Sequence, residues 1–150
     1  MNVTPLLNKI ETARRRFNRH YQSLPVTALE GPDLPNGWSV KDLLGHISAW
    51  EQYLVDRLTG AETGPISDAE IDARNRATYQ QRKDWSWQDV EAEAQTTFVR
   101  LSATLKSLPP EQLDDRLTAQ LIAVNTFDHY AEHQPWLERW AARRRTERRR

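Results

Sequence analysis

The chain has 150 residues, a mass of 17.5 kDa and a formal net charge of zero, which is the size of a single domain. It contains no cysteine, which excludes disulfides, cysteine-based zinc fingers, iron–sulfur clusters and a cysteine nucleophile. Six Trp, four Tyr and three Phe supply large side chains for a core, so the 28% of charged residues do not indicate a disordered chain.

Apolar residues recur at spacings of three and four between Leu6 and Leu24, the pattern of a single apolar stripe on a helix. They predict a first helix of about 20 residues, ended by Pro25 because the proline ring blocks helix continuation. Residues 25–37 contain three prolines and two glycines and are predicted to form a loop.

The second helix has a strong predicted start. Ser39 is the expected N-cap, and Asp42 completes a variant capping box with Asp in place of Glu. Apolar residues then follow at helical spacing as far as Gly60, which favours a helix end.

A long connection follows over residues 61–84. Ser67 and Glu70 form another capping box, which predicts a short helix over about 68–82. Its apolar content is low, so we expect it on the surface of a larger bundle.

The third long helix is predicted to begin at Ser86 and to end before Pro109. Its entry repeats the Trp-Ser-x-x-Asp-apolar order of the second helix. The residues that follow differ, so we interpret the repeat as two independent uses of one good helix start rather than as a duplication.

The fourth long helix is predicted from about Thr118 to Ala142, with a kink at Pro135 because the proline ring crowds the carbonyl of Ala131. Four long helices without a strand pattern predict an all-α four-helix bundle. The connection between its second and third helices carries a short extra helix.

The C-terminal residues 143–150 read RRRTERRR, a charge of +5, which leaves −5 on the rest of the chain. We expect two parts, a bundle domain over 1–142 and a basic tail over 143–150. An acidic body is a poor nucleic-acid surface. The tail is interpreted as a solvated helix end, with contact to polyanions as the alternative.

No apolar run approaches the ~20 residues of a membrane helix, and the N-terminal residues lack an apolar signal core. We therefore expect a cytoplasmic protein without a membrane partner. The sequence also lacks GxGxxG and GxxxxGK motifs, which argues against a dinucleotide or P-loop site.

Two histidines, His129 and His133, are four residues apart on the last predicted helix, so both imidazoles can reach one metal ion. His46 lies mid-helix within the apolar face of the second helix and should point inward. Bundles build metal sites from inward side chains on facing helices. The alternative is a hydrogen-bonded core His46 and a solvent-facing pair; His20 is not interpreted as a ligand.

Four neighbours about one helical turn or less from these positions are candidates for orienting a ligand or lining a pocket: Asp42, Trp50, Asn125 and Trp136. Asp42 or Asn125 could accept an imidazole N–H, although the capping box competes for Asp42. Glu51 and Glu132 are interpreted as solvated or salt-bridged carboxylates, with metal coordination or a role as base as the alternative.

The segments over residues 37–51 (GWSVKDLLGHISAWE) and 129–136 (HYAEHQPW) resemble the DinB/YfiT-like superfamily, and within it the ClbS/DfsB-type four-helix bundle proteins. The resemblance implies a bundle of unusual connectivity, often a homodimer. It also implies a divalent metal held by His46, His129 and His133. Activities in the superfamily include thiol-dependent transferases and isomerases that use bacillithiol, mycothiol or glutathione, and ClbS-type members hydrolyse a genotoxic metabolite.

We therefore expect a metal-dependent enzyme acting on a small electrophilic molecule in a pocket between the second and fourth helices. The metal could be Zn, Ni, Fe or Mn, and a thiol would be an external cosubstrate because the chain has no cysteine. One alternative is a protein that binds or sequesters a metal or small molecule without turnover. A third hypothesis is a nucleic-acid-binding or partner-binding role for the arginine tail.

Overall fold

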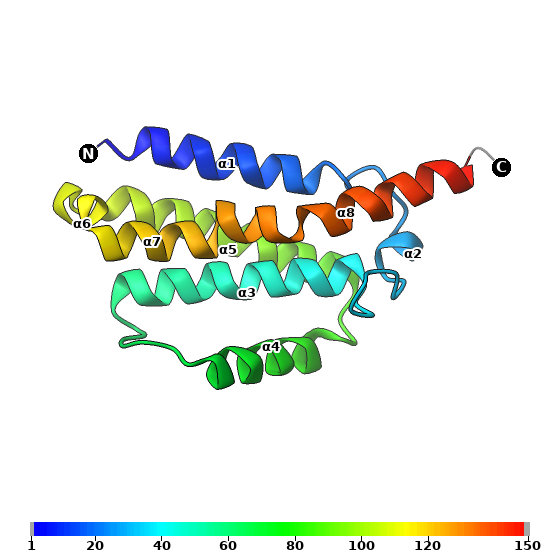
Figure 1. The fold of residues 1–150 in the computed structure, drawn as a ribbon, viewed down its shortest axis with the longest axis horizontal. Coiled ribbons are helices and arrows are strands. Elements are labelled where there is room, and N and C mark those ends of the chain that lie inside the picture. The colour runs from blue at the N-terminus through cyan, green and yellow to red at the C-terminus, as the bar shows by residue number, and fades with distance from the viewer. Residues whose placement is uncertain (1, 149–150) are drawn as a thin grey trace.

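The computed structural model describes residues 2–148, and all regular structure within that range is helical (Figure 1). The helices are α1 (Thr4–Asn18), α2 (Val26–Leu29), α3 (Val40–Thr59), α4 (Asp68–Arg82), α5 (Trp87–Ser107), α6 (Pro110–Asp114), α7 (Arg116–Asn125) and α8 (Phe127–Arg148). The predicted all-α bundle and the predicted short helix over 68–82 are confirmed.

Helix α3 is the centre of the bundle. The capping box at its start is formed as predicted, since the Ser39 Oγ accepts from the Asp42 N–H at 3.0 Å and the Asp42 carboxylate accepts from the Ser39 N–H at 3.0 Å. The helix ends at Gly60, whose φ of 84° is a left-handed conformation that suits glycine. Most side chains between these ends are buried, so α3 is covered on nearly every face.

Helix α5 packs along α3, and the two supply much of the apolar core. A Cβ at Gly45 would lie 3.3 Å from the Arg82 Cδ and 3.9 Å from the Val90 Cγ1, so α3 approaches its neighbours closely here. The most deeply buried large side chains of the bundle are Phe17, Ile10, Leu43, Leu44, Ile47, Leu54, Leu101, Leu105, Ile122, Tyr130, Leu137 and Trp140.

Helix α4 lies on the outside of α3, as its sequence predicted, and none of its side chains is buried (Figure 1). Polar contacts fix it instead of apolar packing. Its Asn75 Oδ1 accepts from the Trp50 indole N–H at 2.8 Å, and Arg82 forms an ion pair with Glu93 of α5 at 2.6 Å. Helix α4 is therefore tied to α3 through Asn75 and to α5 through the two hydrogen bonds between Arg82 and Glu93.

The prediction of one continuous fourth helix over residues 118–142 is wrong, because the chain forms two helices there that are divided at Thr126. This residue has φ −127° and ψ −108°, outside the helical range. Its hydroxyl donates to the Ile122 carbonyl at 2.7 Å, and the Asn125 side chain donates to the Leu121 carbonyl at 2.9 Å. These side chains satisfy carbonyls at the end of α7. Helix α8 continues through Pro135.

The first helix is shorter than predicted. Helix α1 ends at Asn18, and turns replace the last predicted helical residues, although Tyr21 within them is still buried. The predicted loop over 25–37 contains the single turn of α2. Pro25 is the N-cap of the short α2. Pro110 is the first residue of α6, a position where the missing proline N–H costs no helix hydrogen bond.

The basic tail begins as a direct continuation of α8, which is helical as far as Arg148; residues 149 and 150 lie outside the described residues. Arg143 donates to the Asp33 carbonyl at 3.0 Å, and Arg144 forms an ion pair with the Asp33 carboxylate. The tail therefore has a partner in the loop after α2, which its sequence did not indicate. That the tail is a separate unit stays a prediction.

Across residues 2–148, the helices are either too short or too polar to cross a lipid bilayer.

Candidate metal centre

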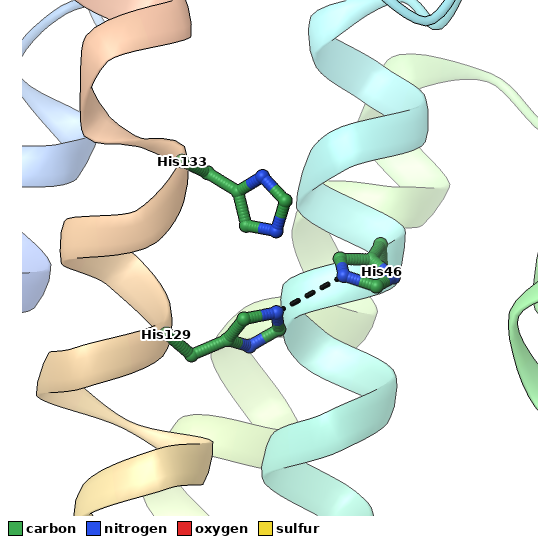
Figure 2. Close-up of side chains that lie close together, drawn as sticks. All are labelled: His46, His129 and His133. Atoms are coloured by element: carbon green, nitrogen blue, oxygen red, sulfur yellow. Dashed lines mark hydrogen bonds between the residues drawn. The ribbon is translucent and has the colours of Figure 1, made fainter. Parts of the chain in front are cut away.

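Three histidines meet between the middle of α3 and the first turns of α8. His46 points from α3 toward α8, and His129 and His133 point back from successive turns of α8 (Figure 2). The spacing of four residues places the α8 pair on one face, as the sequence predicted. Because of the division at Thr126, α8 begins only two residues before His129, so the local chain direction at the site is set by this new helix.

The imidazoles are close enough to share one ion. The Nε2 atoms of His46 and His129 are 3.0 Å apart, and one candidate ligand atom from each of the three rings lies within 4.8 Å of the others. The three pairs of ring centroids are separated by 4.9, 5.2 and 5.0 Å. Two nitrogens held at ~2.1 Å from one ion would be separated by about 3.0–3.4 Å, so the 3.0 Å contact fits a shared ion.

Burial keeps these imidazoles neutral. His46, His129 and His133 are 7%, 8% and 8% exposed. Burial lowers the pKa of His46 to about 3, with a further lowering by His133, and it lowers the pKa of His129 to about 2, with help from His46 and His133. Burial also lowers the pKa of His133. Neutral imidazole is the state that binds a metal, so the site is ready for one at neutral pH.

The Nδ1 atoms of all three histidines are buried without a hydrogen-bond partner among the described residues. An unsatisfied buried polar atom destabilises the fold, and three such atoms in one cluster call for an explanation. An ion bound where the Nε2 atoms of His46 and His129 meet would relieve their close approach, and each Nδ1 would then carry the N–H of its ring. The donor set thus fits a divalent metal.

Two tryptophans flank the histidines. The Trp38 ring centroid lies 5.0 Å from that of His46, and the Trp136 centroid lies 4.9 Å from that of His133. Trp136 was predicted as a pocket residue. Trp38 was not, although its position just before the α3 N-cap pointed to apolar packing at the entry of that helix.

The other predicted neighbours have different partners. Trp50 packs on Tyr53, with ring centroids 5.1 Å apart, and its indole reaches Asn75 of α4. Asp42 is engaged in the capping box, and Asn125 bonds to its own helix. Asn75 also raises the pKa of His46 against the effect of burial, so it lies beside the cluster. Asn75 lies on the surface helix α4, so the hydrophobic pattern of the sequence did not predict that it contacts the site.

The two nearby acids do not join the cluster, and the group of candidate ligands in the described chain contains only the histidines. Glu51 is fully buried and pairs with Arg14 of α1, with its Oε2 3.2 Å from the Arg14 Nε. The Tyr130 hydroxyl donates to the same carboxylate. Glu132 is exposed and only raises the pKa of His133 against burial.

Glu51, Arg14 and Tyr130 form a second polar cluster that joins α3, α1 and α8. Burial raises the pKa of Tyr130, and Glu51 raises it further, so its hydroxyl stays protonated and donates. Tyr130 follows His129 directly, so this cluster fixes α8 against α3 next to the histidines. Glu51 is thus a salt-bridged carboxylate, one of the two states predicted from the sequence, and its partner Arg14 was not predicted.

Five cavities on the described surface have volumes between about 390 and 600 Å³. None of the five is lined by His46, His129 or His133. One of about 600 Å³ is lined by Tyr130, Ala131 and Pro135 on the side of α8 that faces α1. The pocket predicted between the second and fourth helices is not among these five.

The chain is similar to several known structures. It superimposes on an uncharacterised protein from Escherichia coli UTI89 with a TM-score of 0.79 and 16% identity, over 93% of this chain and 92% of that one. A protein from Streptococcus pneumoniae gives a TM-score of 0.76 and 15% identity, over 93% and 90%. A structure described as "Sibling Lethal Factor Precursor - DfsB" gives 0.76 and 13% identity, over 95% and 96%.

The TM-scores show that these proteins share the fold of this chain. A family model described as the DinB superfamily matches residues 9–139. A search of curated proteins finds no match to the chain.

Proposed function

Because the chain belongs to the DinB superfamily, we propose that it is a metalloprotein in which His46, His129 and His133 hold one divalent ion. One observation carries this proposal: three buried, neutral imidazoles place their candidate ligand atoms within 4.8 Å of one another. No carboxylate of the described chain belongs to the group. Three protein ligands leave coordination positions open, which is typical of catalytic rather than structural sites.

We further propose that the protein is an enzyme acting on a small electrophilic molecule, either as a hydrolase or as a thiol-dependent transferase. A divalent ion at this site supplies Lewis acidity and lowers the pKa of a water molecule or thiol. Since the chain has no cysteine, the thiol would be an external cosubstrate. Zn, Ni, Fe and Mn all accept imidazole ligands, so the donor set does not select one of them.

The protein's own residues support this chemistry in three ways. The histidines stay neutral and therefore bind without competition from protons. Trp38 and Trp136 place apolar rings against His46 and His133 and exclude bulk water from them. The contact between Glu51 and Tyr130 fixes the separation of the two helices that carry the ligands.

A second candidate function is binding of a metal or small molecule without turnover. The low exposure of the histidines favours it, as does the position of the five cavities, since none has a triad residue in its lining. In that case the ion would mainly join α3 to α8.

The resemblance to the superfamily also leads us to propose a homodimer, which analytical ultracentrifugation tests.

Turnover separates the two candidates. The purified protein, loaded with each of the four metals in turn, is incubated with a panel of epoxides, activated esters and alkyl halides, with and without glutathione. An enzyme should consume at least one electrophile at a rate that falls to background in His133→Ala. Stoichiometric metal with no turnover above the background rate would favour the binding function.

A further inference from the structure

A cavity of about 500 Å³ lies on the opposite side of α8 from α3, between α8 and the end of α1 with the turns that follow it. Figure 1 shows α8 running beside the second half of α1 and then past its end, alongside the chain that follows α1. The polar and charged residues that line the cavity are Arg16, Arg19, His20, Ser23, Gln134, Glu138, Arg144 and Arg145. Its volume falls within the range of small-molecule sites.

The cavity concentrates positive charge. Its lining has four arginines and one glutamate, a net charge of +3 with His20 neutral. Arg144 is paired with Asp33 and Glu147. Arg16, Arg19 and Arg145 form no ion pair with any residue in the range 2–148.

The three unpaired arginines lie close enough to His20 to lower its pKa. Burial lowers the pKa of His20, and Arg145, Arg16 and Arg19 lower it further against the opposite effect of Glu138. The three guanidinium groups are thus near enough to a common point to repel a proton there. The dipole of a helix C-terminus accounts for single arginines, but it does not account for their convergence from two helices on one hollow.

His20 and Gln134 are uncharged polar residues that line the same cavity as the arginines. The Gln134 side chain lies 2.7 Å from the His20 Nε2, and the neutral ring accepts a hydrogen bond there. A neutral imidazole that accepts at one nitrogen carries its proton on the other, so His20 keeps one N–H donor. The cavity therefore combines guanidinium groups and neutral donors, the groups that bind a tetrahedral oxyanion.

We propose that this cavity binds the phosphate group of a small anionic molecule, at a site separate from the histidine cluster. Several guanidinium groups around one hollow suit a dianion with several acceptor oxygens better than a single carboxylate. The rest of the surface opposes an extended polyanion, since residues 1–142 carry a net charge of −5. A duplex nucleic acid would need a long positive surface, whereas a small phosphate needs only this cavity.

Inorganic phosphate and phenyl phosphate are the two probes, because they share the phosphate group and differ in the organic part. Each is titrated into the full-length protein labelled with ¹⁵N, at an ionic strength held constant with sodium chloride. We expect saturable shifts of the backbone amides of Arg19 and His20 and of the Gln134 side-chain amide. Tighter binding of phenyl phosphate assigns the site to a phosphate ester, and equal or weaker binding assigns it to the free ion.

Two variants test the cavity, Arg19→Gln and Arg145→Gln. Each removes one charge-assisted contact, so each should weaken phosphate binding by about tenfold or more. The control is Arg76→Gln, which removes the same charge from an exposed position of α4 and should bind phosphate as the unaltered chain does. Dialysis against EDTA should leave the shifts unchanged, because the site does not depend on the histidine cluster.

Three results would overturn the proposal. The first is that chloride alone reproduces the shifts. The second is that Arg76→Gln weakens the binding of phosphate as much as Arg19→Gln does. The third is that duplex DNA binds more tightly than both phosphates and loses affinity equally in all three variants, which would indicate a diffuse polyanion surface in place of a cavity.

Discussion

Single residues decide whether the site can hold an ion, and the histidines are the residues to change. In His129→Ala we expect the metal content to fall well below one ion per chain with helicity retained, because two imidazoles remain where three converge. Elemental analysis and circular dichroism measure the two quantities. His20→Ala is the matched control and should keep full metal content, since His20 lies outside the cluster. Full metal content in a variant lacking all three cluster histidines would refute the assignment.

The buried histidines also predict how the metal-free protein responds to acid. Their pKa values are lowered in the folded state, to about 3 for His46 and about 2 for His129. The unfolded chain therefore takes up protons below about pH 6.5 that the folded chain does not, and stability falls as the pH drops toward the folded values. We expect the melting temperature of the EDTA-treated protein to fall between pH 7 and pH 5.

Carboxylates titrate mostly below this range, so histidines dominate the change between pH 7 and pH 5. A variant with glutamine at positions 46, 129 and 133 is the control and should show a flatter profile. If the melting temperature of the unaltered, metal-free protein stays constant over this range, the three histidine side chains are not buried as described.

At the scale of helices, the cluster of Arg14, Glu51 and Tyr130 joins three elements through a buried carboxylate. Glu51→Leu leaves the Arg14 charge buried without its partner, which should cost about 3–5 kcal/mol of unfolding free energy. Arg14→Met combined with Glu51→Leu removes both charges and should recover most of that loss. Urea unfolding measures both variants. A double variant as unstable as the single one would mean that the pair contributes more than mutual neutralisation.

Sequence patterns predicted the elements that depend on local signals. The capping box at Ser39 and Asp42 marked the start of α3, and Ser67 marked the start of α4 as its N-cap, where the Glu70 carboxylate accepts from the Ser67 hydroxyl in place of the predicted backbone N–H. The division at Thr126 escaped prediction because neither glycine nor proline marks it. Side-chain bonds from Asn125 and Thr126 to their own helix stabilise the break, and such bonds also occur within continuous helices.

The candidate site was predictable as far as its ligands, and less so in its surroundings. The spacing of His129 and His133 and the apolar face around His46 favoured a shared site, the family resemblance implied it, and the structure brings the three side chains together. Asn75 and Trp38 depend on contacts between segments far apart or outside a helix, which periodicity does not report. Helix α3 is buried on nearly all faces, so the hydrophobic pattern could not tell which partner Glu51 faces.

For the whole molecule, the tail offers a test of where the folded unit ends. Truncation after Ala142 should leave the melting temperature and the metal content nearly unchanged. It removes the contacts of Arg143 and Arg144 with Asp33, and exposed ion pairs of this kind contribute only about 0.2–1 kcal/mol. Thermal unfolding and elemental analysis measure both effects. A loss of several degrees would mean that the tail is part of the folded domain.

The coordination of the ion tests the central claim most directly. X-ray absorption spectroscopy of the metal-loaded protein counts the imidazoles around the ion and the atoms that complete its coordination. We predict three imidazole nitrogens at ~2.0–2.1 Å, with the remaining positions filled by water or other small ligands. An ion with fewer than three imidazoles would contradict the metal site, and a fourth protein ligand that closes the coordination would contradict the catalytic function proposed for it.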